Sequence, residues 1–275
     1  MNATIEIRQL ATIAGKEFWD RIRSLWVLAI ALVFTVCALG IAYFGGAQQG
    51  AVGFRSMDFT IASLVSLVIY LIPLIALVLG FDAVVGERER GSLDLLLALP
   101  LTRVELLLGK YCGLAAVLAF STVAGFGLVA VVLAPRLTLA ALGAYGLFMA
   151  SAVLLGCAFL GIAVMISVFA SDRTRASGLA IGTWFLFVLM FDLLLLGALV
   201  VSGGRYGGGV FPYLLLLNPA DVFRVLNVSS LSAVARASGL ATVFPRELAN
   251  PALLIGVLVL WCIAPLGLAA WRFRR

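Results

Sequence analysis

The chain contains no histidine, and only 12% of its 275 residues are charged, against about 25% in soluble domains. Because histidine is the commonest general base and metal ligand, its absence excludes Ser-His-Asp hydrolysis and HExxH metalloprotease sites. The sequence also lacks the G-x-x-x-x-G-K-S/T loop that cradles nucleotide phosphates. We therefore expect a chain that is not an enzyme and that holds no metal or cofactor of its own.

Cysteine is scarce, and each occurrence lies alone in a separate apolar run, with no Cys-x-x-Cys pair. This distribution does not favour structural disulfides, and it predicts that the thiols pack as small apolar side chains. The methionines are scattered too, so packing explains them better than a path for a soft metal ion. The four cysteines are Cys37, Cys112, Cys157 and Cys262.

Hydrophobic residues, in contrast, make up 64% of the chain, more than a soluble fold of this length could bury. They are concentrated in six runs, each long enough to cross a bilayer, which takes about 20 residues. The sequence therefore predicts an all-α membrane protein with six transmembrane helices in a single domain over residues 1–275. The predicted spans cover roughly residues 25–45, 60–82, 109–134, 142–170, 176–201 and 252–271.

Positive charge is distributed unevenly along the chain, whose net charge is +6. Thirteen of the nineteen Lys and Arg residues lie on the side that holds both termini, and the positive-inside rule makes that side cytoplasmic. We expect a multi-pass protein of a bacterial inner membrane with both termini in the cytoplasm. The basic residues lie in short loops and form no stripe on a soluble domain, which excludes nucleic acid as a partner.

Two segments outside the spans carry structure of their own. Residues 1–24 predict an amphipathic helix that lies on lipid at the membrane interface, or else a cytoplasmic extension of the first span. The loop over 202–251 contains FPYLLLLNPADVFRVLN, which predicts short re-entrant or outer helices before the last span. We expect this loop to contact an extracytoplasmic partner, with candidates Tyr206, Phe211, Asn218, Asp221 and Arg224.

An ionisable residue inside a span is a functional candidate by default. Asp192 is the clearest case, because FVLMFDLLLLGALV flanks it with apolar residues on both sides. Two interpretations stay open at this point. The carboxylate either belongs to a transport or proton pathway, or it is protonated or hydrogen-bonded to a neighbouring helix.

The segment 84–106 is a charged interruption between the second and third predicted spans. ERERGSLDLLLALP begins with four charges, continues with leucines and stops at a proline. Thr102 and Glu105 have the spacing of a capping box that opens the next helix. The leucines Leu93, Leu95, Leu96, Leu97 and Leu99 predict a sticky surface. This surface either docks into a groove of another protein or rests on lipid headgroups.

With this segment in place, the chain resembles the type-two family of ATP-binding-cassette exporter permeases over essentially its whole length. The resemblance implies that the segment is a cytoplasmic coupling helix inserted into a cleft of a separate ATPase subunit, which binds ATP and Mg²⁺. It also implies a homodimer, because the family's ATPases work in pairs. The matching positions are Glu87, Glu89, Gly91, Ser92, Asp94 and Pro100, with Arg88 and Arg90 beside them.

Within that family, GFDAVVGERERGSLDLLLALP, LGKY and LLLLNPADVFR are similar to the branch that serves nitrous oxide reductase maturation. This resemblance implies a periplasmic β-helical protein and a copper-chaperone lipoprotein as further partners. The task would be to supply a sulfur species, or mechanical work, for the copper–sulfur centre. The alternatives are an exporter permease for a lipid-linked sugar or a drug, and a membrane scaffold that transports nothing.

Overall fold

The computed structural model of the chain describes residues 6–23, 25–44, 57–98, 100–133, 139–201, 211–229 and 250–274. Within these ranges every regular element is a helix, which confirms the all-α prediction. The helices are α1 (Ile7–Ile22), α2 (Leu25–Phe44), α3 (Met57–Gly80), α4 (Val85–Glu89), α5 (Ser92–Leu97), α6 (Arg103–Leu133), α7 (Leu139–Phe169), α8 (Arg173–Phe185), the π-helical turn η3 (Leu186–Met190), α9 (Phe191–Val201), α10 (Phe211–Leu215), α11 (Pro219–Ser229) and α14 (Pro251–Arg274).

Five helical segments of the described residues are long and apolar enough to cross a membrane. They match the second to sixth predicted spans. The first predicted span corresponds to α2, in which the described apolar stretch Leu32–Ile41 is shorter than a crossing, so a sixth span stays a prediction. The five segments are Ile61–Glu89, Arg103–Val132, Leu142–Phe169, Arg173–Val201 and Pro251–Phe273.

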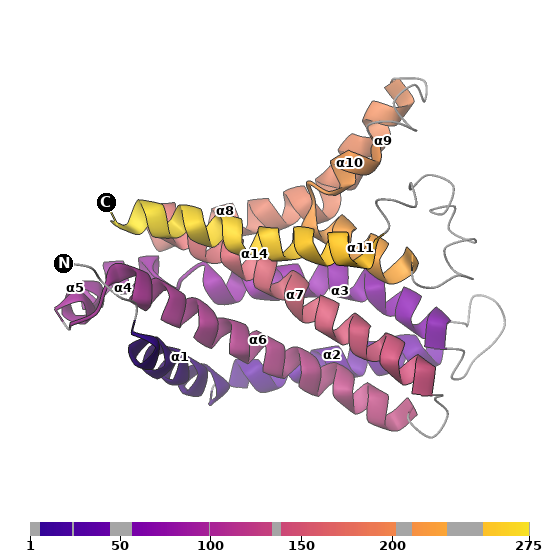
Figure 1. The fold of residues 1–275 in the computed structure, drawn as a ribbon, viewed down its shortest axis with the longest axis horizontal. Coiled ribbons are helices and arrows are strands. Elements are labelled where there is room, and N and C mark those ends of the chain that lie inside the picture. The colour runs from indigo at the N-terminus through magenta and orange to yellow at the C-terminus, as the bar shows by residue number, and fades with distance from the viewer. Residues whose placement is uncertain are drawn as a thin grey trace.

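Helix α7 is the centre of the bundle and packs against α3, α6 and α14 (Figure 1). The spans differ in how much of this packing they share. Within the apolar window of each span, 72% is buried for Leu142–Phe169 but only 11% for Arg173–Val201. The span Arg173–Val201 therefore turns most of its apolar side chains outward, where lipid or another chain can cover them.

The least buried span is also irregular. Its helix begins at Arg173, because the Asp172 carboxylate accepts a hydrogen bond from the Arg175 backbone N–H at 2.8 Å and caps the first turn. The π-helical turn η3 interrupts it half-way, and α9 then leaves the bundle at an angle to α8 (Figure 1). A π-turn of this kind is an identifiable cause of a helix bend.

Both described ends of the chain lie at the end of the bundle that holds α4 and α5 (Figure 1). The Glu6 backbone N–H donates to Glu105 at 2.7 Å, and Arg103 donates to the Phe273 carbonyl at 3.3 Å. The first turn of α6 therefore joins the start of α1 to the end of α14. Of the predicted loop 202–251, the described part forms α10 and α11, and α11 packs among α3, α7 and α14.

Candidate functional site

The charged segment folds as two short helices, α4 and α5, joined by Gly91. Gly91 has φ +71°, a left-handed conformation that only glycine adopts at little cost. Gly91 is the N-cap residue of α5, and the Ser92 hydroxyl donates a hydrogen bond to the Glu87 carbonyl at 3.3 Å. This bond satisfies a carbonyl at the end of α4 and holds the two helices in a fixed corner.

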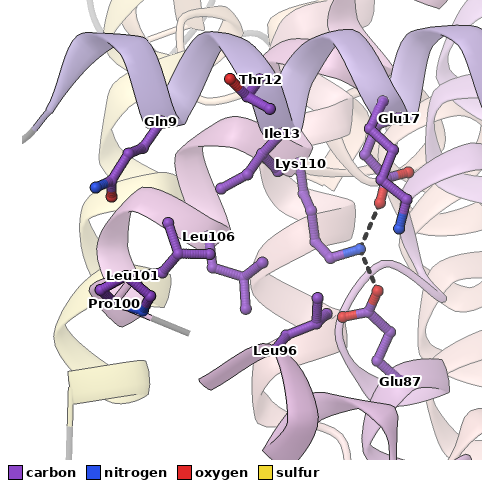
Figure 2. A pocket seen from close by; sticks show the side chains of 11 residues that line it. Gln9, Thr12, Ile13, Glu17, Glu87, Leu96, Pro100, Leu101, Leu106 and Lys110 are labelled. Atoms are coloured by element: carbon purple, nitrogen blue, oxygen red, sulfur yellow. Dashed lines mark hydrogen bonds and ion pairs between the residues drawn. The ribbon is translucent and has the colours of Figure 1, made fainter. Parts of the chain in front are cut away.

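Lys110 is the hub of the site. Its Nζ lies 2.5 Å from Glu17 of α1 and 2.7 Å from Glu87 of α4 (Figure 2). Only 5% of the lysine side chain is exposed, against 16% for Glu17 and 13% for Glu87. One cation therefore ties three elements together: the N-terminal helix, the charged segment and the long helix α6.

Two glycines on either side of Lys110 seat α1 against α6. A Cβ atom on Gly109 would lie 2.7 Å from the Ile13 side chain. On Gly113 it would lie 2.6 Å from Glu17 and 2.7 Å from the Ala14 carbonyl oxygen. Small residues four apart let helix backbones approach closely in membrane proteins. The stretch GKYCG therefore provides the groove for α1, and the lysine within it provides the charge that α1 pairs with.

Neither the ion pairs of Lys110 nor this groove was predicted from the sequence, although the sequence contains a pattern that indicates both. A single lysine beside an apolar run, enclosed by a G-x-x-x-G pair, is unusual enough to predict a buried ion pair with a neighbouring helix. Identifying its partners needed the structure, because Glu17 and Glu87 are far from Lys110 in sequence.

The capping box at the start of α6 is confirmed. Glu105 accepts from the Thr102 backbone N–H at 2.7 Å and from its hydroxyl at 2.6 Å, and the Glu105 N–H donates back to Thr102 at 3.2 Å. The second oxygen of Glu105 accepts the bond from Glu6 described above. The cap thus fixes the start of α6 and the start of α1 together.

The remaining charges of α4 reach the turn between α7 and α8. Arg88 donates to the Ala170 carbonyl at 3.0 Å and to the Val168 carbonyl at 3.3 Å. Glu89 accepts from the Arg173 backbone N–H at 2.7 Å. Arg173 in turn pairs with Asp82 at 2.7 Å, just before α4. The charged segment is therefore anchored to the junction of two spans as well as to α1 and α6.

The outer face of the segment is free of these anchors. Its most exposed leucine is Leu95, at 74%, whereas Leu93 is buried at 8%. The expectation that Leu93 contributes to a sticky outer surface is therefore wrong, because that side chain fills the space under α5. Leu99 lies outside the described residues. The exposed tip comprises Arg90, Gly91, Asp94, Leu95 and Pro100.

A second charged cluster lies at α11, in the other half of the bundle. Arg224 contacts Asp192 of α9 at 3.0 Å and Asp221 of its own helix at 2.7 Å. Asp192 thus bonds to a neighbouring helix, which is one of its two interpretations. Asn218 caps α11 by accepting from the Ala220 N–H at 3.0 Å, and it donates to the Phe187 carbonyl in η3 at 2.8 Å. This cluster holds α11 beside the bend of the irregular span.

The burial of α11 bears on the residues expected to contact an extracytoplasmic partner. Asn218 and Asp221 are each only 1% exposed, so their polar groups serve α11 and offer no surface to a second protein. Arg224 remains one-third exposed. Tyr206 lies outside the described residues. Phe211 begins α10, but its side chain also lies outside the described part.

Comparison with known proteins gives this architecture its family. Residues 11–275 match the profile described as "ABC-2 family transporter protein". The chain belongs to the ABC-2 transporter family. The chain is also 48% identical to "Probable ABC transporter permease protein NosY" of Pseudomonas aeruginosa, over 96% of this chain and 97% of that protein. A protein of the same description from Stutzerimonas stutzeri is 44% identical, over 98% and 99%.

As an ABC-2 family member, the chain is the membrane-embedded permease subunit of an ABC transporter. A permease of this kind implies an ATPase as its partner. The Lys110 hub and the Arg224 cluster are two of the charged groups that join helices in the described part of the chain.

Proposed function

We propose that α4 and α5 form the contact through which a separate cytoplasmic ATPase moves this permease. The permease is a homodimer of six-span chains with α2 as the first span, and the end that holds α4 and α5 faces the cytoplasm. ATP and Mg²⁺ bind to the ATPase, and this chain contributes no cofactor. The observation that carries the proposal is that the segment has two parts. One is the exposed tip described above, and the other is an anchored base, which consists of Glu87, Arg88 and Glu89.

The exposed tip has the chemistry of a docking surface. Leu95 presents an apolar side chain, with Asp94 and Arg90 beside it for polar contacts at the rim. Interfaces commonly bury such an apolar anchor within a polar surround. The left-handed Gly91 sets the angle between α4 and α5, so the tip has a defined shape before the partner arrives.

The anchored base accounts for transmission of movement. A displacement of the tip pulls on α1 and α6 through Lys110. It also pulls on the α7–α8 junction through Arg88 and Glu89. Helices α8 and α9 form one span that bends at η3, so a shift at α8 reaches α9 in the other half of the bundle. ATPase closure supplies the difference in contact energy between two positions of the base.

Replacing the tip residue Leu95 by alanine tests the docking step. We expect Leu95→Ala to weaken co-purification of the ATPase about tenfold, since it removes a side chain worth about 1.5–3 kcal/mol when buried. The control is Leu128→Ala on α6, a leucine that is 55% exposed and distant from the segment. If both variants retain the ATPase equally, the tip is not its docking surface.

The NosY likeness supports a specific task. We propose that the transporter serves maturation of nitrous oxide reductase, by exporting a sulfur species or doing mechanical work at the periplasmic face. Its partners are then a NosF-like ATPase, a NosD-like periplasmic β-helical protein and a NosL-like copper-chaperone lipoprotein. Support comes from near full-length identity of 44–48% to the proteins described as NosY.

Gene deletion and complementation test this task. Nitrous oxide reductase from a deletion strain should lack its copper–sulfur centre in optical spectra, and the full chain should restore it. Leu95→Ala should restore it poorly, and Leu128→Ala fully. Normal reductase in the deletion strain would assign the chain to another cargo, such as a lipid-linked sugar or a drug. Full rescue by a variant that no longer binds the ATPase would favour a scaffold.

A further inference from the structure

A cavity of about 440 Å³ lies between α1, the charged segment and the first turns of α6 (Figure 2). This volume is in the range of small-molecule sites. Ile13, Leu96, Leu101 and Leu106 form apolar walls. The cavity runs along α1 from Gln9 to the Lys110 hub at Glu17, a separation of eight residues or about 12 Å of helix.

Each end of the cavity holds a buried acceptor without a donor. At the hub, Glu87 gives one carboxylate oxygen to Lys110, and its other oxygen, Oε2, is buried without a hydrogen-bond partner. At the other end, Gln9 donates its Nε2 to Glu6 at 2.8 Å, which fixes the amide, and its Oε1 is buried without a partner. A buried polar atom without a hydrogen-bond partner destabilises the structure, so both positions favour a ligand with N–H groups.

The net charge of the Lys110 hub also favours a ligand with N–H groups, and in particular a cationic one. A single Lys110 faces the two carboxylates of Glu17 and Glu87, which leaves one negative charge uncompensated in a largely buried place. Lys16 also lines the cavity, but it is exposed, where solvent screens its field. A cationic donor group therefore gains most at Glu87.

We propose that this cavity binds a linear aliphatic polyamine. One ammonium group donates to Glu87 Oε2 at the hub, the alkyl chain lies against the leucines, and a second amine donates to Gln9 Oε1. A monoamine of the same length satisfies only one acceptor. A single lysine side chain of a partner protein reaches one end and leaves much of the cavity empty. The ligand stiffens the seat of α1 and so regulates movement of the base, whether or not Leu95 docks the ATPase.

Spermidine binding to the purified full-length chain, measured calorimetrically without the ATPase, tests the proposal. Attraction without specificity is disfavoured because the chain already carries a net charge of +6. We expect Glu87→Gln to weaken binding at least about tenfold, because a charge-assisted bond is lost. Gln9→Leu, which leaves the Lys110 pairs intact, should weaken it about fivefold. The matched control Asp20→Asn removes an exposed carboxylate of α1 that does not line the cavity, and this variant should bind as the unchanged chain does.

Any one of three binding results would overturn the proposal. These are absence of binding at millimolar spermidine, equal binding by Gln9→Leu and the unchanged chain, and equal affinity for an alkyl monoamine. A cross-link that places a lysine of the ATPase inside the cavity would also overturn it, by identifying a protein occupant. None of these results changes the outcome for Leu95→Ala, so failure here and failure of the docking proposal are distinguishable.

Discussion

Each half of the molecule contains one cation held between two carboxylates, but the two clusters are built differently. Lys110 is 5% exposed, and its partners Glu17 and Glu87 come from two other elements. Arg224 is 33% exposed, and one partner, Asp221, lies three residues away on its own helix. Its other partner, Asp192, is 42% exposed.

The difference indicates that the Lys110 hub joins distant elements, whereas the Arg224 cluster mainly stabilises its own helix. Removing one member of a buried pair leaves an uncompensated charge, whereas exposed pairs contribute little because water screens them. Lys110 is buried, and both of its ion pairs are with residues distant in sequence, so three elements depend on it. Only the Asp192 contact of Arg224 reaches another element, and it is the more exposed one. The first cluster therefore suits transmission of force, and the second suits holding α11 in place.

The largest expected effect follows removal of Lys110. Lys110→Met leaves Glu17 and Glu87 facing each other without a cation, and we expect it to lower the free energy of unfolding by about 3–5 kcal/mol. Thermal unfolding in detergent measures this. The control Lys16→Met removes an exposed lysine of α1 and should change stability by less than about 0.5 kcal/mol. Equal effects of the two variants would mean that the buried ion pairs of Lys110 contribute no more to stability than an exposed lysine does.

Arg224→Met comes next, since Asp221 is 1% exposed and loses its cation. We expect a loss of about 2 kcal/mol, because Asn218 still donates to Asp221 at 2.8 Å. Asp192→Asn should cost less than about 1 kcal/mol, since that side chain is the exposed partner. The rate of amide hydrogen exchange in α9 and α11 measures the loss of stability in both variants. A larger effect for Asp192→Asn would reverse the roles assigned to the two aspartates.

A smaller effect tests the seat of α1 without changing charge. Gly113→Ala places a Cβ 2.7 Å from the Ala14 carbonyl oxygen, a backbone atom that cannot move independently. We expect a loss of about 1–2 kcal/mol, with easier proteolysis of α1. Gly127→Ala, on the same helix but with open space around it, is the control and should be neutral or stabilising. An intact α1 in Gly113→Ala would mean that the close backbone approach at Gly113 is not needed to hold α1 against α6.

The smallest effect concerns an exposed carboxylate at the α7–α8 junction. Hydrogen bonds from the Arg175 backbone N–H and the Ser171 hydroxyl lower the pKa of Asp172 below its ordinary value. Its cap therefore stabilises α8 fully above the unfolded pKa, and this is lost as the pH falls through the lower folded pKa. The protection factor of the Arg175 amide, which is the exchange rate corrected for its intrinsic pH dependence, should fall there. Asp172→Asn should remove the pH dependence and keep the cap, and an unchanged profile would contradict the assignment.

Several features of the fold were predictable because they depend on local sequence. Five spans follow from apolar runs, and the start of α6 follows from Thr102 and Glu105, which bond to each other across one turn. The sequence could not predict which leucines of α5 are exposed. The turn at Gly91 decides which face of α5 packs inward, and it places Leu93 inside and Leu95 outside. Asp221 looked available to a partner and is buried by helices distant in sequence.

By itself the sequence determined that this is a helical membrane protein with a charged interruption after its second apolar run. The transfer of long apolar runs out of water leaves little other choice. Only the tertiary structure decided which charges of the interruption face inward. Two glycines let α1 approach α6 closely and bring Glu17 to Lys110, and the position of α4 brings Glu87 to the same amine. Such a meeting of three distant segments depends on packing geometry, which no local pattern encodes.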